Sequence, residues 1–538
     1  MSRMLFGMET EYAVHGSGGD VSEAERQARM RQLLDVARQK FKYVGDFGGG
    51  MFLENGSRLY IDCGHHPELS TPECTDPWQV VRYILAGERT LLDIAGEIAE
   101  RKNETALSFF KSNVDYSGSG ATWGCHESYL HRSAPGAISE EIIPHLISRV
   151  IYTGAGGFNS LAAGLTFTLS PRVPHLEKVV SEHSTSARGI FHTKDESLSR
   201  EGYHRLHLIC GESLCSQTAM WLKVATTALV VAMAEAGIRV SEAVTPRAPL
   251  TALRVFATDP ACRAKALVAQ RRWMSAVEIQ RAYLESAEAH LGDSFMPDWA
   301  AAACRQWRKI LDRLESGYEG VNTTLDWAIK LTLYRDYAAR QGFKWETLAL
   351  WTEIHNRLDA ALGYPADFGG PTLADTLADD ARLVDERRNL QPYLHQHGLR
   401  WEGLRKFLQL RRQLFEIDTR FGELGDRGIF TKLANSDVLT HEVAQLGEIG
   451  EFVRTPPPSG RAFLRGKFIA RVIDNRERFE CDWQGIWDRS RDRFLDLSDP
   501  FASTERWLKL DRRLETRFNL VPEGLRERMR HLEGYRRY

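Results

Sequence analysis

The sequence predicts an α+β protein built on a largely antiparallel sheet. Polar and apolar residues alternate with period two, as in half-buried strands, at 5–14, 58–63, 122–130 and 204–210. Apolar residues recur at helical spacing over 22–40, 78–100, 216–236 and most of 260–360. Strands therefore come early, and helices lie between them and after them. This order favours helices packed on an antiparallel sheet over a repeating strand–helix unit.

Composition is that of an ordinary globular protein. The 538 residues exceed the size at which one hydrophobic core keeps growing, so we expect a large domain and at least one smaller unit. The chain is 43% hydrophobic and 26% charged, with a mean hydropathy of -0.36. A net charge of -2 and a pI near 6.8 provide no basic field, which argues against nucleic acid as a partner.

The cysteines and the apolar stretches predict a cytoplasmic protein with no membrane segment. Eight cysteines occur without CxxC spacing, and acidic residues appear too early in MSRMLFGMETEYAV for a signal peptide. The most apolar stretch, 222–238, is interrupted by Thr226, Thr227 and Glu235 and is too short to span a bilayer. We expect it to form a buried helix.

Proline and charge patterns predict the domain organisation. Pro456–Pro458 cannot continue a helix or a sheet and predict a boundary between a large domain, 1–455, and a small C-terminal domain, 461–538. A Pro-, Gly- and acid-rich run at 364–390 is followed by basic residues on an amphipathic stretch. We interpret about 340–410 as an exposed helical insertion that could recruit a protein partner. The alternative is a solvated helix face without a partner.

The first candidate strand carries two acidic residues on one face. Phe6, Met8 and Tyr12 alternate with Glu9 and Glu11. Cβ atoms two residues apart on a strand lie about 6.5–7 Å apart, so both carboxylates could serve one cation cluster. An ordinary half-exposed strand with its acids toward solvent is the alternative.

A second strand repeats the arrangement with a different mixture. Arg58, Tyr60 and Asp62 share the polar face. Arginine suits phosphate, tyrosine and carboxylates can ligate hard cations, and a fixed aspartate can accept a proton. We expect a loop after this strand, in which Glu68 adds a further carboxylate and Thr71 a hydroxyl. Zinc held by Cys63, His65, His66 and Cys74 is a weaker alternative, because the spacing fits no standard site.

Two later strands bring histidines. His126 and Glu127 are adjacent and must face opposite ways, so only one can join a shared site. Arg205 and His207 lie on the same face. Each histidine alone could be structural, but together the four strands predict a polar sheet face that holds a metal–phosphate cluster.

Several motifs now resemble the Pup ligase and Pup deamidase family. They are GMETEYAV, NGSRLYIDCGHHPELSTPECTDP, AGER, FKSNVDYSG, GCHESYL, HTKDE, YHRLHLICGE, WLKV and LRGKFIARV. They run in order over most of the chain but not over about 340–410. The resemblance implies a glutamine-synthetase-like fold, with a large curved antiparallel sheet, packed helices and a small C-terminal domain that contributes to the nucleotide site.

The resemblance also implies roles for particular residues, carried over motif by motif. Glu9, Tyr60 and Glu68 are expected to bind magnesium, and Asp62 is expected to be the catalytic base. The expected ATP contacts are Arg58, Thr71 and Trp483. His126 and His207 are second-tier candidates for the metal or phosphate.

The expected activity is that of a Mg·ATP-dependent carboxylate–amine ligase. ATP would convert a carboxylate to an acyl phosphate, which an amine, such as a protein lysine, would attack. The carboxylate would belong to a small protein or peptide. A deamidase or isopeptidase is the first alternative, favoured by PECTDP and by RGIF at Arg188–Phe191. A phosphotransferase and an ATP-stabilised binding protein are the others.

Overall fold

A sheet of nine strands forms the centre of the part of the chain that the structure describes. The computed structural model describes residues 4–15, 23–62, 64–102, 107–183, 186–194, 198–200, 202–362, 382–440, 446–472 and 476–509. Across the sheet the order is β11 (Lys178–Ser181), β12 (Gly189–His192), β13 (His204–Leu208), β8 (Cys125–His131), β1 (Phe6–Glu11), β6 (Pro67–Ser70), β5 (Arg58–Ile61), β4 (Met51–Leu53) and β3 (Tyr43–Gly45). All neighbours pair antiparallel except β11 and β12. The predicted α+β class is confirmed.

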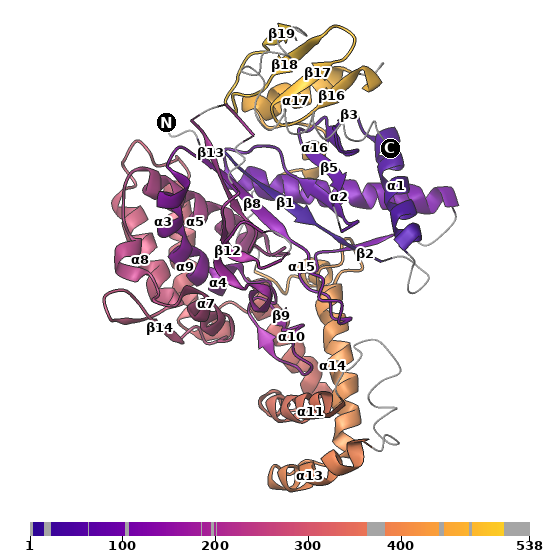
Figure 1. Cartoon of the computed structure of the whole chain (residues 1–538), viewed down its shortest axis with the longest axis vertical. Coiled ribbons are helices and arrows are strands. Elements are labelled where there is room, and N and C mark those ends of the chain that lie inside the picture. Colours follow the sequence, from indigo (N-terminus) through magenta and orange to yellow (C-terminus); the bar gives the residue numbers. More distant parts are fainter. Residues whose placement is uncertain are drawn as a thin grey trace.

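Helices cover the apolar face of this sheet, where Phe6, Met8 and Leu206 point into the main core. Those helices are α2 (Pro77–Lys102), α3 (Pro135–Ser148), α5 (Gln217–Glu235), α8 (Ala276–Ala289) and α9 (Ala300–Leu314). Figure 1 shows α3, α5, α8 and α9 gathered on one side of the sheet. α1 (Glu23–Lys40) packs on α2.

Helix α5 confirms the expected buried helix. It is the one helix among the described residues that is long and apolar enough to cross a membrane, but 94% of that window is buried inside the fold. Trp221 of this helix stacks on Trp78 of α2, with ring centroids 5.2 Å apart. α5 therefore belongs to the core, and its apolar composition follows from that position.

A second group of helices projects from the body, as Figure 1 shows below the sheet. It contains α10 (Asp326–Arg340), α11 (Leu348–Leu362), α13 (Arg382–Gln396) and α14 (Glu402–Phe421). These helices share a separate core that includes Leu358, Leu390 and Phe407. α14 continues well past 410, and the run at 364–390 lies largely outside the described residues. The insertion as a unit stays a prediction.

The base of this projection is fixed by a buried ion pair. Lys330 Nζ of α10 lies 2.7 Å from Asp418 Oδ1 of α14. Tyr116 and Tyr334 each donate a hydroxyl hydrogen bond to the same carboxylate, at 2.7 and 2.5 Å. A buried carboxylate with three such partners holds the two helices in one relative position.

The C-terminal part is a small sheet with one helix, at the top of Figure 1. α17 (Gly460–Arg471) follows Pro456–Pro458 and packs with β16 (Phe479–Cys481), β17 (Gly485–Asp488), β18 (Arg493–Asp496) and β19 (Trp507–Lys509). Its core also contains Val44 and Phe52, which belong to β3 and β4 of the large sheet. The two parts therefore share buried apolar surface, and the boundary at 455–461 stays a prediction.

Short elements complete the described chain. They are β2 (Ala13–His15), β7 (Ser108–Phe110), α4 (Val150–Thr153), β9 (Gly157–Phe158), β10 (Phe167–Thr168), α6 (Ser241–Val244), α7 (Pro249–Ala257), β14 (Lys265–Leu267), β15 (Trp273–Ser275), α15 (Ile429–Asn435) and α16 (Ile449–Phe452).

Candidate functional site

The register of the central strands aligns the predicted residues in rows on the polar face. Opposite residues of an antiparallel pair share a face. Glu9 lies opposite His126 on one side and Ser70 on the other, and Ser70 lies opposite Arg58. The neighbouring row joins Glu11, Glu68 and Tyr60. The sheet itself therefore brings together residues from four separate segments.

Glu9 is surrounded by two histidines and an arginine. Its carboxylate lies 3.5 Å from His126 Nδ1, 3.9 Å from Arg205 Nη1 and 4.0 Å from His207 Nε2. Burial opposes its ionisation, but the hydrogen bond with His126 and the charge of Arg205 outweigh burial and hold the pKa of Glu9 well below its ordinary value. Glu9 is therefore ionised.

Glu68 is a buried carboxylate close to that charge. It lies on β6, so the sequence-based expectation of a loop at this position is wrong. All four residues of this strand are buried and show no alternation. Burial and the neighbouring charge of Glu9 raise the pKa of Glu68 well above its ordinary value. The same two causes, with Glu68 itself, raise the pKa of the Tyr60 phenol.

These side chains fit a hard divalent cation. Possible ligand atoms of Glu9, His126 and His207 lie within 4.8 Å of one another, and so do those of Glu11, Glu68 and His126. The second set, which has two carboxylates, is the oxygen-rich one and suits Mg²⁺. A cation between Glu9 and Glu68 would offset the repulsion that now favours the protonated form of Glu68.

Arg205 orients the His207 ring. Arg205 Nη2 and His207 Nδ1 are 2.9 Å apart. A guanidinium can only donate, so Nδ1 accepts and Nε2 carries the hydrogen of the neutral ring. Burial and the charge of Arg205 lower the pKa of His207 well below its ordinary value. In this arrangement His207 presents a donor to the site, which suits an anion such as phosphate better than a metal.

Arg58 is held in place at the start of β5. Its Nε donates to Asp46 Oδ2 at 2.7 Å, and its guanidinium carbon lies 4.0 Å from the centroid of the Tyr60 ring. Burial lowers the pKa of Arg58, but Asp46 and the other acidic neighbours outweigh burial and raise it. Arg58 is thus a fixed cation in the same row as Glu9.

Asp62 follows β5 directly. Its Oδ1 accepts the backbone hydrogen bond of His66 at 2.6 Å, and its Oδ2 lies 3.6 Å from His66 Nδ1. Burial raises the pKa of Asp62, but the hydrogen bonds with His66 outweigh burial and lower it. Asp62 is therefore an ionised acceptor two residues beyond Tyr60 along the chain.

The weaker zinc hypothesis finds no support in this region. Cys74 is fully buried and its thiol donates to the carbonyl oxygen of Pro72 at 3.2 Å. His66 is engaged with Asp62. Cys63 lies outside the described residues.

A cavity of about 80 Å³ lies between this face and the C-terminal part. Glu9, Thr71 and Arg205 line it from the large sheet, and Trp483 and Arg461 line it from the C-terminal part. Thr71 accepts the backbone hydrogen bond of Met8 through Oγ1 at 3.0 Å. The Trp483 ring packs edge-on against Phe52 at 5.0 Å between centroids. Arg58 and Tyr60 on β5, and Asp62 directly after it, do not line this cavity.

Two buried arginines join the C-terminal helix α17 to the loop after β6. Glu73 receives a bidentate contact from Arg465, at 2.9 and 3.0 Å, and an ion pair from Arg461. Burial raises the pKa of Glu73, but Arg465 and Arg461 outweigh burial and lower it from 4.5 to about 2. The wall of the cavity that carries Trp483 is thus tied to the large sheet by charge.

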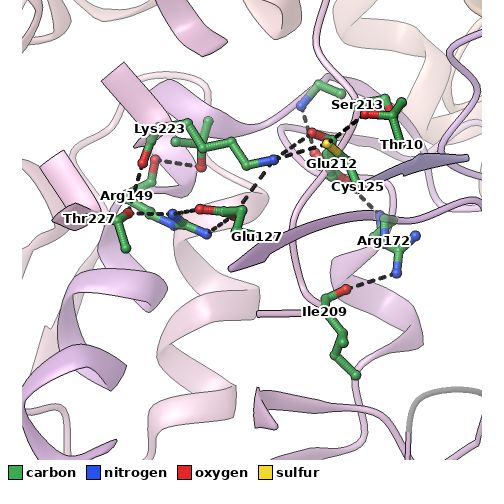
Figure 2. A network of polar contacts seen from close by, with 12 residues as sticks. Thr10, Cys125, Glu127, Arg149, Arg172, Ile209, Glu212, Ser213, Lys223 and Thr227 are labelled. Atoms are coloured by element: carbon green, nitrogen blue, oxygen red, sulfur yellow. Dashed lines mark hydrogen bonds and ion pairs between the residues drawn. The ribbon is translucent and has the colours of Figure 1, made fainter. Parts of the chain in front are cut away.

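The opposite face of β8 contains a buried charge network, drawn in Figure 2. Glu127 accepts from both terminal nitrogens of Arg149 at 2.6 and 2.8 Å, and Lys223 Nζ lies 3.6 Å away. Lys223 also donates to the carbonyl oxygen of Glu212 at 2.9 Å. As predicted, Glu127 and His126 point to opposite sides. Glu127 fixes β8 to α5 through Lys223 and to Arg149, the residue between α3 and α4, and leaves His126 to the site.

Sequence reasoning placed Arg205 on the polar face as a cation, but it assigned no role to Asp46, Glu73, Arg461 or Arg465. Glu73 and Arg465 stand inside the quoted motifs PECTDP and LRGKF, so a signal was present without a function attached to it. Asp46 and Arg461 meet their partners only through the fold, and the local pattern contains no such signal.

Comparison with known proteins decides the family. Residues 4–354 match the family model described as Pup-ligase protein. The chain belongs to the Pup-ligase family. The Pup-ligase match covers more than half of the chain and includes every predicted site residue except Trp483.

Curated members of the Pup-ligase family align with almost the whole chain. The Pup–protein ligase of Xylanimonas cellulosilytica is 30% identical over 96% of this chain and 100% of that protein. Pup–protein ligase 1 of Rhodococcus erythropolis is 30% identical over 94% of this chain and 98% of its own length. The Pup–protein ligase of Nocardioides sp. is 31% identical over 94% of this chain and 97% of its own length. This Pup-ligase family member is therefore an enzyme of the ligase class.

Solved structures of Pup ligases share the fold. The complex between prokaryotic ubiquitin-like protein Pup and its ligase PafA matches with a TM-score of 0.70 at 24% identity, covering 100% of this chain and 97% of that one. PafA in complex with ADP matches with a TM-score of 0.64 at 24% identity, covering 91% and 93%. The architecture predicted from the sequence motifs is confirmed.

Proposed function

We propose that this chain is a Mg·ATP-dependent ligase that joins a carboxylate of a small protein to an amine, such as a lysine of a second protein. One observation carries the proposal: Glu9, which neighbours the row with Glu11 and Glu68, lines a cavity together with Thr71, Arg205 and Trp483. A nucleoside triphosphate needs a cation and an arginine for its phosphates and an aromatic wall for its base, and a cation site beside this cavity would provide them. The curated relatives are named as Pup–protein ligases, and one solved relative contains ADP.

Each predicted residue has a place in this proposal. Glu9, Glu68 and Tyr60 would hold Mg²⁺, with His126 beside them, and the metal would offset charge on the phosphates. Arg58, Thr71, Trp483, Arg205 and His207 would bind the nucleotide. Arg58 and Arg205 flank the carboxylates and supply fixed positive charge, which suits phosphate oxygens.

The chemistry proceeds in two displacements. A carboxylate oxygen attacks the γ-phosphorus of ATP, and ADP leaves, so that an acyl phosphate forms. The amine then attacks the acyl carbon, and inorganic phosphate leaves with the oxygen that the carboxylate contributed. Asp62 accepts the proton that the amine loses. Its lowered pKa keeps Asp62 ionised and ready to accept throughout the neutral range.

We further propose Pup as the carboxylate donor and a protein lysine as the acceptor. Support comes from the relatives' names and from the Pup complex of the solved ligase. The projecting helices α11, α13 and α14 offer a surface for a protein partner. A reducing, cytoplasmic setting is in keeping with the seven cysteines of the described residues, all of which are free thiols.

The test incubates the purified chain with Mg·ATP, a Pup protein ending in glutamate and a lysine-rich acceptor protein. Mass spectrometry follows the adduct while ADP is quantified. We expect one ADP per adduct and no adduct without ATP. Loss of ammonia from a Pup ending in glutamine without net ATP use would support a deamidase instead. A stable phosphorylated product would support a phosphotransferase, and ATP binding with neither product would support a binding protein.

A further inference from the structure

The turn between β3 and β4, residues 46–50, is built around one carboxylate. Asp46 Oδ1 accepts the backbone hydrogen bonds of Gly48 and Gly50, both at 2.8 Å. Its Oδ2 receives Arg58 Nε at 2.7 Å and lies 2.5 Å from Arg58 Nη2. The Asp46 side chain is only 4% exposed. One oxygen therefore shapes the turn, and the other holds the arginine.

This arrangement fixes the guanidinium from two sides. The Tyr60 ring lies beneath it, and Asp46 occupies its Nε and Nη2 edge. At Gly50 an added Cβ would lie 2.6 Å from Tyr60 Cβ and 2.8 Å from Asp46 Oδ2, so only glycine allows the turn to approach this closely. The Arg58 side chain is 25% exposed, and its hydrogen bond and ion pair to Asp46 use Nε and Nη2, which leaves Nη1 without a polar partner among the described residues.

The same turn touches the C-terminal part that supplies Trp483. Asp46 forms a parallel backbone bridge with Cys481, two residues before Trp483. The neighbouring Phe47 packs edge-on against Trp487 at 5.2 Å between centroids. Asp46 thus stands where β5, the β3–β4 turn and the small sheet meet.

We propose that Asp46 is a positioning residue for nucleotide binding, acting through Arg58. Asp46 does not touch the ligand. It holds the Arg58 guanidinium in the orientation in which its free side can meet a phosphate, and it anchors that arginine beside the strand leading to Trp483. This inference rests on the proposed function, in which Arg58 binds ATP.

The alternative is an ion pair that only supports the turn, and Asp46→Asn separates the two. An asparagine oxygen can still accept from Gly48 and Gly50, so the turn is retained, but the charge pairing with Arg58 is lost. We expect Asp46→Asn to weaken Mg·ATP binding roughly tenfold, a usual size for coupling within a charged contact. In an Arg58→Ala background the same change should alter affinity by less than about twofold, because its target is gone.

Isothermal titration calorimetry with Mg·ATP measures all four proteins of this cycle, and thermal unfolding checks their fold. The matched control is Asp93→Asn, which breaks another Asp–Arg pair, to Arg89 at 3.0 Å on α2, and should leave affinity unchanged. If Asp46→Asn does not fold, Asp46→Glu replaces it, because it keeps the charge but displaces the carboxylate. Asp46→Glu should likewise weaken Mg·ATP binding in the wild-type background and have little effect on it in the Arg58→Ala background.

The outcomes separate the inference from the proposed function. If Arg58→Ala leaves ATP affinity unchanged, Arg58 is not a nucleotide ligand, and both fail. If Arg58→Ala weakens binding while Asp46→Asn does not, only the inference fails. The inference would also fail if Asp46→Asn lowered ATP affinity equally with Arg58 present and with Arg58→Ala, because Asp46 would then act independently of Arg58.

Discussion

At the scale of single residues, the pairing of β1 with β6 brings Glu9 and Glu68 close together, and we propose that they hold a cation. Glu9 is kept ionised by His126 and Arg205, whereas burial and the charge of Glu9 favour the protonated form of Glu68. Binding of Mg²⁺ needs both carboxylates ionised. The cation should therefore displace a proton from Glu68.

We predict that Mg·ATP binding releases protons. As pH falls through the raised pKa of Glu68, the proton competes better and apparent Mg²⁺ affinity should fall. Calorimetry in buffers of different ionisation enthalpy measures the protons released. Glu9→Gln removes the charge that raises the pKa of Glu68, so it should reduce the release as well as the affinity. Heats that are independent of buffer would contradict this account.

A substitution of Asp62 separates ATP binding from the chemical step. Asp62→Asn keeps the shape and can still accept from the His66 backbone, but it cannot take a proton at neutral pH. We expect adduct formation to fall by about 10²–10⁴-fold, the usual contribution of a positioned base, with ATP affinity little changed. Single-turnover assays and calorimetry measure the two quantities, with Asp93→Asn as the control. Wild-type turnover would remove Asp62 from the mechanism.

Most of these residues could be found from the sequence because they alternate with buried neighbours. Glu9, Arg58, Tyr60 and His126 stand on strands with one apolar face, and that pattern is local. Asp46 shows why prediction stops there. Asp46 lies in a turn, and the composition of that turn, with Gly48 to Gly50, indicates nothing more than a turn. Its partner Arg58 lies on another strand. Its role depends on the register of β4 with β5.

At the scale of elements, the alternation of polar and apolar residues predicted β1, β5, β8 and β13 but not β6, β4 or β3. The last three are short, and β6 and β4 are buried at every position, so period two is absent. Glu68 was accordingly expected in a loop, as a further carboxylate of the site, and the family motif then indicated it as a magnesium ligand. Strand pairing, which aligns Glu68 with Tyr60 and Glu11, is set by contacts distant in sequence.

The β3–β4 turn yields a prediction about stability. Gly50→Ala would force a Cβ against Tyr60 and Asp46, and overpacking of this kind costs about 1–3 kcal/mol. Gly45→Ala, in the adjoining strand, meets nothing within 4 Å and should change stability by less than about 0.5 kcal/mol. Denaturant unfolding of both variants measures the difference. Equal stabilities would show that the turn relaxes without loss.

At the scale of the whole molecule, the site depends on how the C-terminal part meets the large sheet. The sequence predicted a domain boundary at Pro456–Pro458, because prolines interrupt both helix and sheet. It could not predict that Val44 and Phe52 complete the small core. Nor could it predict that Glu73 binds two arginines almost 400 positions later in the chain.

Glu73 makes that contact dependent on pH. Its pKa is lowered from 4.5 to about 2 in the folded state, so its contribution is complete above about pH 4.5 and is lost as pH falls toward 2. The full contribution is on the order of 3 kcal/mol. Glu73→Gln should therefore lower Tm at pH 7, and the gap to wild type should shrink below pH 4.5. Thermal scans from pH 7 to 3.5 measure this gap. A gap that stays constant over that range would contradict the assignment.

The central claim is that this fold activates a carboxylate by phosphorylation, and the path of one oxygen atom tests it. The Pup carboxylate is labelled with ¹⁸O at both positions, the ligation is run with unlabelled Mg·ATP and water, and the released phosphate is analysed by mass spectrometry. An acyl phosphate requires one ¹⁸O in each phosphate released and one retained in the new amide. Phosphate that contains no ¹⁸O while adduct accumulates would show that the amide forms by another route and would contradict the account.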